Sequence, residues 1–291
     1  MKPPPFAYVR AASVDEAVAK LREWEGEARL LAGGQSLVPL LNMRLARPAC
    51  VVDVNRVEGL DGVHEEDGVV RIGALVRHAT LELSPVIAAT LPLLARMVRF
   101  VGDRQVRLRG TLGGSLAHAD PTGELPLAAV ALGATVTARG PGGIRELSAG
   151  ELLEGPYATS LAGDEMITQV AFPARAGTVG AFAEVTRRHG DFAVLAVAAV
   201  GEPGADGAWR SVRIALGGVA GRPFHAAEAS ALAAGTHLEP DVVAAIGEAC
   251  AGAAEPYSDI RASAEYRRHL IPVYVARVLA ELARHRLEAA L

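Results

Sequence analysis

Apolar residues recur at two different spacings along the N-terminal part of the chain. Between residues 14 and 25 they lie three to four positions apart, which predicts an amphipathic helix that begins after a capping box of Ser13 and Glu16. The apolar runs ARLL at 28–31 and ACVVDV at 49–54 predict strands. Between them, QSLVPLLNMRL predicts a short helix that starts late because of Pro39. The pattern predicts a small β–loop–α–β unit over roughly residues 28–54.

A second group of elements begins after Asp67. The segments GVVRIGAL, TVTAR and EMITQVAF predict strands. LPLLARMVRFVG and GELPLAAVALG predict helices, the first of them closed by Gly102. The segment PARAGTVG at 173–180 is small, contains glycine and is weakly patterned, so it predicts a domain boundary.

The pattern changes beyond that boundary. AFAEVTRR, FAVLAVAAVGE and WRSVRIALGGV predict three strands, and helical spacing returns over 225–234, 240–253 and 263–288. Strands followed by helices predict an α+β C-terminal domain.

Composition and charge narrow the possible functions. The formal net charge of −4 offers no chain-wide attraction to nucleic acid or to an anionic membrane. No apolar run is long enough to span a bilayer, and the start MKPPPFAYVR lacks a signal-peptide core, so we expect a cytoplasmic protein without an integral membrane segment. Cys50 and Cys250 are the only cysteines, and the His residues have no HExxH spacing, so we expect no metal site. Redox chemistry in this chain would need an organic cofactor.

Two glycine stretches, AGGQS at 32–36 and GTLGGS at 110–115, are the candidate ligand-binding segments. Glycine allows successive backbone N–H groups to point at one spot, and nearby hydroxyls add donors, which suits a phosphate or diphosphate. Neither GxxxxGK[ST] nor GxGxxG after the first strand is present. On the residues alone, a plain turn and an anion cradle both remain open. Asp120 and Glu124 could likewise bind cofactor hydroxyls or only complement a helix dipole.

Four segments carry a resemblance that runs essentially from end to end. They are LLAGGQSLVPLLNMRLARP (30–48), VGDRQVRLRGTLGGSLAHADPTGELP (101–126), RRHGDFAVLAVAA (187–199) and SAEYRRHLIPVYVAR (263–277). In their order and their residues, these segments resemble the FAD-binding medium subunit of molybdenum hydroxylases. This is the carbon monoxide dehydrogenase flavoprotein type, which is related to the flavin domain of xanthine dehydrogenase.

This resemblance implies an α+β fold in two domains. Residues 1–176 would form a two-lobed PCMH-type FAD-binding domain, with lobes of about 1–57 and 58–176. Residues 177–291 would form a C-terminal domain of a three-stranded antiparallel sheet and a three-helix bundle.

The resemblance also implies which residues bind FAD. The two glycine loops would hold the diphosphate, and the remaining residues would lie near the flavin or contact other parts of the cofactor. The implied set is Leu31, Ala32, Gly33, Gly34, Gln35, Ser36, Leu37, Val101, Gly102, Thr111, Leu112, Gly113, Gly114, Ser115, Asp120, Glu124, Ile167 and Phe182.

Four positions depart from the family's usual residues. Gln35 stands where carbon monoxide dehydrogenases tend to have His, which weakens the case for carbon monoxide as substrate. Leu108 replaces a frequent Asn, and Ala183 and Glu184 stand where relatives often have a Lys. The charge near the flavin or its electron acceptor is therefore open.

The resemblance implies electron transfer within a larger complex. A large molybdenum-cofactor subunit would oxidise the substrate, a small subunit with two 2Fe–2S clusters would pass electrons on, and this chain's FAD would release them to an external acceptor, in a dimer of heterotrimers. We expect no catalytic residue in this chain. His78, His118 and Asp120 are expected to order a loop, and Tyr266, Arg267 and Arg268 to form a contact patch on the last helix.

Two other functions remain open at this stage. A self-sufficient FAD-dependent oxidase of the PCMH type would need substrate-binding bases or a covalent flavin attachment residue, and no convincing His or Cys lies in the glycine loops. A cofactor-free scaffolding relative would have lost the loops, and both are present. The sequence does not identify the substrate of the complex or its electron acceptor.

Overall fold

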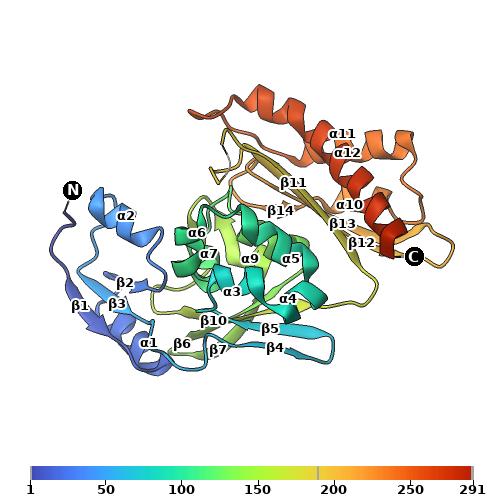
Figure 1. Cartoon of the computed structure of the whole chain (residues 1–291). Helices are drawn as coiled ribbons and strands as arrows, with labels where there is room; N and C mark the ends of the chain where they lie inside the picture. The colour runs from blue at the N-terminus through green and yellow to red at the C-terminus, as the bar shows by residue number, and fades with distance from the viewer. Residues whose placement is uncertain (1, 189, 290–291) are drawn as a thin grey trace.

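The computed structural model describes residues 2–188 and 190–289 (Figure 1). The residues outside this description are Met1, His189, Ala290 and Leu291. His189 belongs to the segment RRHGDFAVLAVAA (187–199), one of the four that carry the resemblance. The chain has the expected mixed α/β architecture, built on three main sheets that follow one another along the sequence. In Figure 1 the N-terminal sheet lies on one side of the central sheet, and the C-terminal sheet lies on the other.

The N-terminal sheet is parallel, with strand order β1-β3-β2. Its elements are β1 (Ala7–Arg10), α1 (Val14–Glu23), β2 (Ala28–Leu31), α2 (Leu37–Asn42) and β3 (Cys50–Asp53). The predicted β–loop–α–β unit is therefore confirmed. Ser13 caps α1 by accepting from the Glu16 N–H, but the Glu16 carboxylate accepts from the N–H of Ala12, one residue before the cap.

The central sheet is antiparallel, with strand order β4-β5-β10-β6-β7. Its strands are β4 (Val63–Glu66), β5 (Val69–Gly73), β6 (Thr135–Gly140), β7 (Gly143–Ser148) and β10 (Met166–Pro173), and β8 (Leu153–Gly155) pairs separately with β9 (Ala158–Thr159). The two edge strands, β4 and β7, were not predicted from the sequence. Both carry exposed charged residues, so their apolar alternation is weak.

Short helices connect the strands of the central sheet. They are α3 (His78–Leu83), α4 (Pro85–Thr90), α5 (Pro92–Met97), the 3-10 turn η1 (Val98–Phe100), α6 (Arg104–Arg109), α7 (Leu112–His118), α8 (Glu124–Ala131) and α9 (Ala149–Leu152). The helix predicted over 91–102 is thus α5 followed by η1. Every residue of α8 is buried, because this helix packs both on α5 and α7 and on the C-terminal sheet.

The C-terminal sheet is antiparallel, with order β11-β12-β13-β14. It contains β11 (Val179–Val185), β12 (Leu195–Pro203), β13 (Trp209–Gly217) and the two-residue β14 (Phe224–His225), and is followed by α10 (Ala227–Leu232), α11 (Pro240–Ala253) and α12 (Ala264–Ala289). The three predicted strands and three predicted helices are confirmed, and β14 is an addition. α12 packs on β11 and β12, α10 packs on β13, and α11 contacts both helices. These contacts do not establish a separate three-helix bundle.

Among residues 2–188 and 190–289, no helix combines the length and apolar character needed to cross a bilayer.

Candidate functional site

The first glycine loop leaves a row of backbone donors free. It connects β2 to α2, and Gly34 takes a left-handed φ of +74°, which favours glycine. Within the described part of the chain, none of the N–H groups of residues 33–37 donates to a protein acceptor. We call this row the amide nest. Successive free N–H groups around a left-handed residue form a concave, electropositive surface that binds anions.

The second glycine loop is hydrogen-bonded to the protein instead. Thr111 caps α7, accepting from the Gly114 N–H through its hydroxyl (3.2 Å) and from the Ser115 N–H through its carbonyl (3.0 Å). The N–H groups of Leu112 and Gly113 donate to carbonyls in the segment between β5 and α3, at 3.0 and 2.9 Å. The backbone of this loop is therefore already fixed without a ligand.

The fold brings the two loops into direct backbone contact. A Cβ atom on Gly33 would lie 2.3 Å from the carbonyl oxygen of Arg109 and 2.8 Å from Cα of Gly110. Only glycine at position 33 permits this approach. Two segments more than 70 residues apart in the sequence thus form one surface.

Two side chains that were not predicted from the sequence, Asn55 and Arg77, connect the two glycine loops. The Asn55 amide donates to the carbonyls of Leu31 and Ala32, at 3.2 and 2.9 Å. Arg77 donates to the Asn55 side-chain oxygen at 2.7 Å and to the Arg109 carbonyl at 2.6 Å. Burial, and next the charge of Arg109, lower the pKa of Arg77. We call these hydrogen bonds of Asn55 and Arg77 the clamp. Neither residue lies near a glycine pair in the sequence, so no sequence motif predicts it.

The buried side chain of His78 contacts the second glycine loop. It is 3% exposed, and its Nε2 lies 3.0 Å from both the Thr111 carbonyl oxygen and the Ser115 hydroxyl oxygen. Burial lowers the pKa of His78 to about 4, so the ring is neutral near pH 7. The expectation that His78 orders a loop is confirmed.

The side chains that line the loops divide into exposed and buried groups. Gln35 is exposed and donates to the Gly33 carbonyl, whereas Leu112 and Gly113 are fully enclosed. A Cβ on Gly113 would lie 2.6 Å from Cβ of Ala74, so this glycine is required by packing. Ser36, Leu37, Gly114 and Ser115 are half-buried at the surface of the loops.

The two acidic residues of the predicted site lie just beyond α7. Asp120 is buried and accepts from the N–H and hydroxyl of Thr122, both at 2.8 Å, which confirms that it orders the loop. Glu124 is 9% exposed, and burial raises its pKa to about 7. Glu184 lies on β11. Burial has the largest effect and the charge of Glu124 the second, and both raise the pKa of Glu184 to about 8. One oxygen of Glu184 is buried without a partner among the described residues.

The remaining predicted residues fall in two places. Val101 and Gly102 are half-buried, and Arg107 fixes their carbonyls by donating at 3.1 and 3.2 Å. Ile167 and Phe182 are 5% and 1% exposed in the core around α8, so they present almost no surface to a ligand in this structure.

A hollow of about 260 Å³ opens beside the loop that contains Asp120. Three aromatic side chains lie around it: Tyr157 and Phe192, 61% and 52% exposed, and the partly buried Tyr257. The ring of His118 lies 5.1 Å from that of Tyr157. The segment before Phe192 reaches Gly102, since a Cβ on Gly190 would lie 2.8 Å from the Gly102 carbonyl oxygen. The hollow is therefore lined by the residues that follow Asp120, and the segment that leads to Phe192 contacts Gly102.

The predicted contact patch on the last helix is wrong for Arg267. This side chain is fully buried, donates to the carbonyls of Val194 and Gly218 at 2.6 Å, and pairs with Asp259 at 2.8 Å. The helical pattern could not reveal an inward Arg, because its partners lie in distant loops. Tyr266 and Arg268 are exposed as predicted.

Comparisons with known proteins identify the family of this chain. Residues 4–175 match the family of the FAD binding domain in molybdopterin dehydrogenase, and residues 180–282 match the carbon monoxide dehydrogenase flavoprotein C-terminal domain. The chain is 41% identical to the nicotine 6-hydroxylase medium subunit of Paenarthrobacter nicotinovorans over 97% of this chain and 98% of that one. It is 36% identical to the carbon monoxide dehydrogenase medium chain of Hydrogenophaga pseudoflava, over 96% and 97%.

A solved structure of carbon monoxide dehydrogenase from Hydrogenophaga pseudoflava has the same fold. Its TM-score is 0.95 at 37% identity, covering 98% of this chain and 99% of that one. The amide nest fits the diphosphate of the FAD that this family binds, since it offers a row of free backbone donors. The chain therefore belongs to the family of FAD-binding medium subunits of molybdenum hydroxylases, and it is an oxidoreductase subunit whose cofactor is FAD.

Proposed function

We propose that this chain receives electrons from the 2Fe–2S clusters of a partner subunit and passes them, through FAD, to an external acceptor. The observation that carries the proposal is the amide nest, a row of free N–H groups held against the second glycine loop by Gly33. Free backbone donors aimed at one point favour a diphosphate over a neutral ligand.

The two glycine loops have different parts in this proposal. The nest and the flanking Leu31, Ala32 and Leu37 hold the diphosphate from one side. Residues 111–115 lie on the opposite side of the diphosphate, and the half-buried Gly114 and Ser115 contact the cofactor there. Arg77 supplies a fixed positive charge beside the loops, since it binds both the Asn55 side chain and the Arg109 carbonyl.

The flavin end is assigned to the region around Val101, Gly102, Asp120 and Glu124. α7 is seven residues long and leads about 10 Å away from the second loop towards Asp120, a distance that an extended dinucleotide spans. The aromatic hollow beside Asp120 offers the surface on which a flat ring can stack. Ile167 and Phe182 are assigned to the core behind this region, as supports for it.

When bound, FAD supplies a carrier that exchanges electrons with both one-electron centres and two-electron acceptors. The chain's own residues bind and orient it. We assign no catalytic residue: His78 is enclosed beneath the second loop, and the carboxyl of Asp120 is hydrogen-bonded to Thr122.

The proposal includes a domain organisation and partners. Residues 1–176 would bind FAD in lobes of about 1–57 and 58–176, and residues 177–291 would form the C-terminal domain; the two family matches meet between residues 175 and 180. The partners would be a large molybdenum-cofactor subunit and a small 2Fe–2S subunit, in a dimer of heterotrimers. The relatives' descriptions as a medium subunit and a medium chain support the presence of a larger and a smaller partner.

Purification of the tagged chain from its source organism tests the proposal. Under native conditions it should bring about one molybdenum and about four iron atoms per FAD, as a molybdenum subunit and a two-cluster subunit require. A flavin-loaded chain without either metal that oxidised a substrate unaided would instead identify a self-sufficient oxidase. A chain unable to take up FAD would contradict the cofactor site itself.

A further inference from the structure

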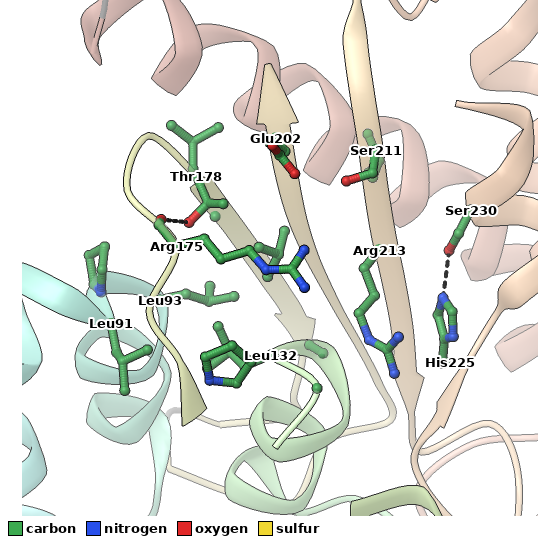
Figure 2. Close-up of a pocket in the computed structure, with 18 of the residues that line it drawn as sticks. Leu91, Leu93, Leu132, Arg175, Thr178, Glu202, Ser211, Arg213, His225 and Ser230 are labelled. Carbon is green, nitrogen blue, oxygen red and sulfur yellow. Dashed lines mark hydrogen bonds between the residues drawn. The ribbon is translucent and has the colours of Figure 1, made fainter. Parts of the chain in front are cut away.

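A second, larger cavity lies between the central helices and the C-terminal sheet (Figure 2). Its volume is about 550 Å³, and it is lined by the turn between α4 and α5, the end of α8, and one end of strands β11–β13. None of the residues assigned to FAD lines it. The eight residues of α8 put about 12 Å between the cavity and Glu124. It is therefore a separate site.

One side of the cavity is apolar. Leu91, Leu93 and Leu132 lie together in Figure 2. Val179 on β11 and Val200 on β12 also line the cavity. Cavities of a few hundred cubic ångströms with a mostly apolar lining are the usual size and character of small-molecule sites.

Two arginines extend into this space without a counter-charge. Figure 2 shows Arg175, from the segment before β11, and Arg213, from β13, both reaching into the cavity. The Nε of Arg213 donates to the Val130 carbonyl at 2.9 Å, but its two terminal nitrogens have no acceptor within residues 2–188 and 190–289. In the same described ranges the Arg175 guanidinium has no side-chain partner. Guanidinium groups with free terminal nitrogens bind carboxylates and phosphates by paired hydrogen bonds.

The other polar groups in the cavity leave this positive charge unbalanced. Glu202 is the only carboxylate in the lining, and it forms an ion pair with Arg210. His225 lies 3.1 Å from the Ser230 hydroxyl. Burial, and next the charge of Arg213, lower the pKa of His225, so this ring adds neither a counter-charge nor a competing positive group near pH 7.

We propose that this cavity binds an amphipathic organic anion, a small molecule with a carboxylate or phosphate head and an apolar body. The head binds Arg213 and Arg175, and the body packs on Leu91, Leu93 and Val200. Arg213 is held in place by Val130, so little side-chain freedom is lost when the anion binds. This site does not depend on the FAD assignment, because the two sites share no residue.

Calorimetric titration of the full-length, FAD-loaded chain with decanoate tests the proposal. We expect one decanoate bound per chain, and an affinity about tenfold lower in each of Arg175→Gln and Arg213→Gln, since each loses a charge-assisted hydrogen bond to the head. Arg175→Gln removes no hydrogen bond or ion pair of the guanidinium within residues 2–188 and 190–289, and an unchanged unfolding temperature of this variant would show that it acts on binding and not on folding. Arg71→Gln makes the same charge change on β5, outside the cavity, and should bind decanoate as the unaltered chain does.

Two further probes test each half of the ligand class. Decanol, which has the chain without the charge, and inorganic phosphate, which has the charge without the chain, should each bind at least about thirtyfold more weakly than decanoate. Equal binding of decanol would overturn the anionic head, and equal binding of phosphate would overturn the apolar body. Absence of decanoate binding, or unchanged binding in both arginine variants, would overturn the site.

Discussion

The two glycine loops have similar sequences, AGGQS and GTLGGS, but the structure uses their backbones in opposite ways. In the first loop, the N–H groups of residues 33–37 find no protein acceptor within the described chain. In the second, the four N–H groups of residues 112–115 all donate, two to the segment after β5 and two to Thr111. The first loop therefore presents donors to a ligand, whereas the second is a fixed wall against which the first is placed.

A glycine pair in the sequence therefore does not by itself indicate a ligand-binding loop. Gly33 permits contact between the loops, Gly34 provides a left-handed turn, and Gly113 avoids Ala74. Each glycine has its own structural reason, and none of these reasons is a ligand. The free donors, which a sequence does not display, distinguish a binding loop from a turn.

The largest expected effect comes from separating the loops. In Gly33→Val, the new side chain would overlap the Arg109 carbonyl and Gly110, so we expect purified protein with less than about one tenth of the normal FAD content. Absorbance and FAD released on denaturation measure this. Gly142→Ala is the matched control, because a Cβ there meets nothing within 4 Å. Normal flavin content in Gly33→Val would contradict the two-loop site.

A smaller loss is expected when the clamp between the loops is removed. Arg77→Gln shortens the side chain that bridges Asn55 and the Arg109 carbonyl. Hydrogen bonds to charged groups contribute about 1.5–3 kcal/mol, so we expect FAD affinity to fall by about tenfold to a hundredfold, measured by titration of the flavin-free chain. Arg71→Gln is the control for loss of a positive charge. An unchanged affinity in Arg77→Gln would show that the clamp has no part in binding.

Removing a single hydroxyl from each loop should separate their functions. Ser36 makes no cap hydrogen bond, so Ser36→Ala should weaken FAD binding by up to about tenfold and leave the stability of the flavin-free chain unchanged. Thr111 caps α7, so Thr111→Val should lower the free energy of unfolding by about 1 kcal/mol. The same result for both variants, in denaturant unfolding and FAD titration, would remove the distinction between the loops.

The smallest effect concerns pH and the two buried carboxyls of Glu124 and Glu184. The pKa values of Glu124 and Glu184, about 7 and about 8, lie above the ordinary 4.5, so the folded chain binds these protons more tightly than the unfolded chain does. Their contribution to stability is complete below pH 4.5 and is lost as the pH rises through 7 and 8.

The unfolding temperature of the flavin-free chain should therefore fall as the pH rises from about 5 to about 8, and Glu184→Gln should remove much of that fall. Glu248→Gln, on the exposed side of α11, should not. A slope that is identical in all three proteins would show that the carboxyl pair is not protonated near neutral pH.

Much of the fold could be predicted from the sequence, because the buried strands and helices have strong apolar patterns. The helix α11 was predicted over 240–253 and found as Pro240–Ala253. The edge strands β4 and β7 were missed, since partly exposed strands lack a clear alternation. Both glycine loops could be identified from their composition and order, whereas Asn55, Arg77 and the inward-facing Arg267 could not, because their partners are distant carbonyls.

Residue-resolved amide hydrogen exchange, with and without FAD, tests the central claim most directly. Amides without acceptors exchange quickly, and hydrogen-bonded amides in packed structure exchange slowly. We predict that the amides of residues 33–37 exchange quickly in the flavin-free chain and become protected when FAD binds, whereas those of 112–115 are protected in both states. FAD binding that left residues 33–37 unprotected would contradict the account.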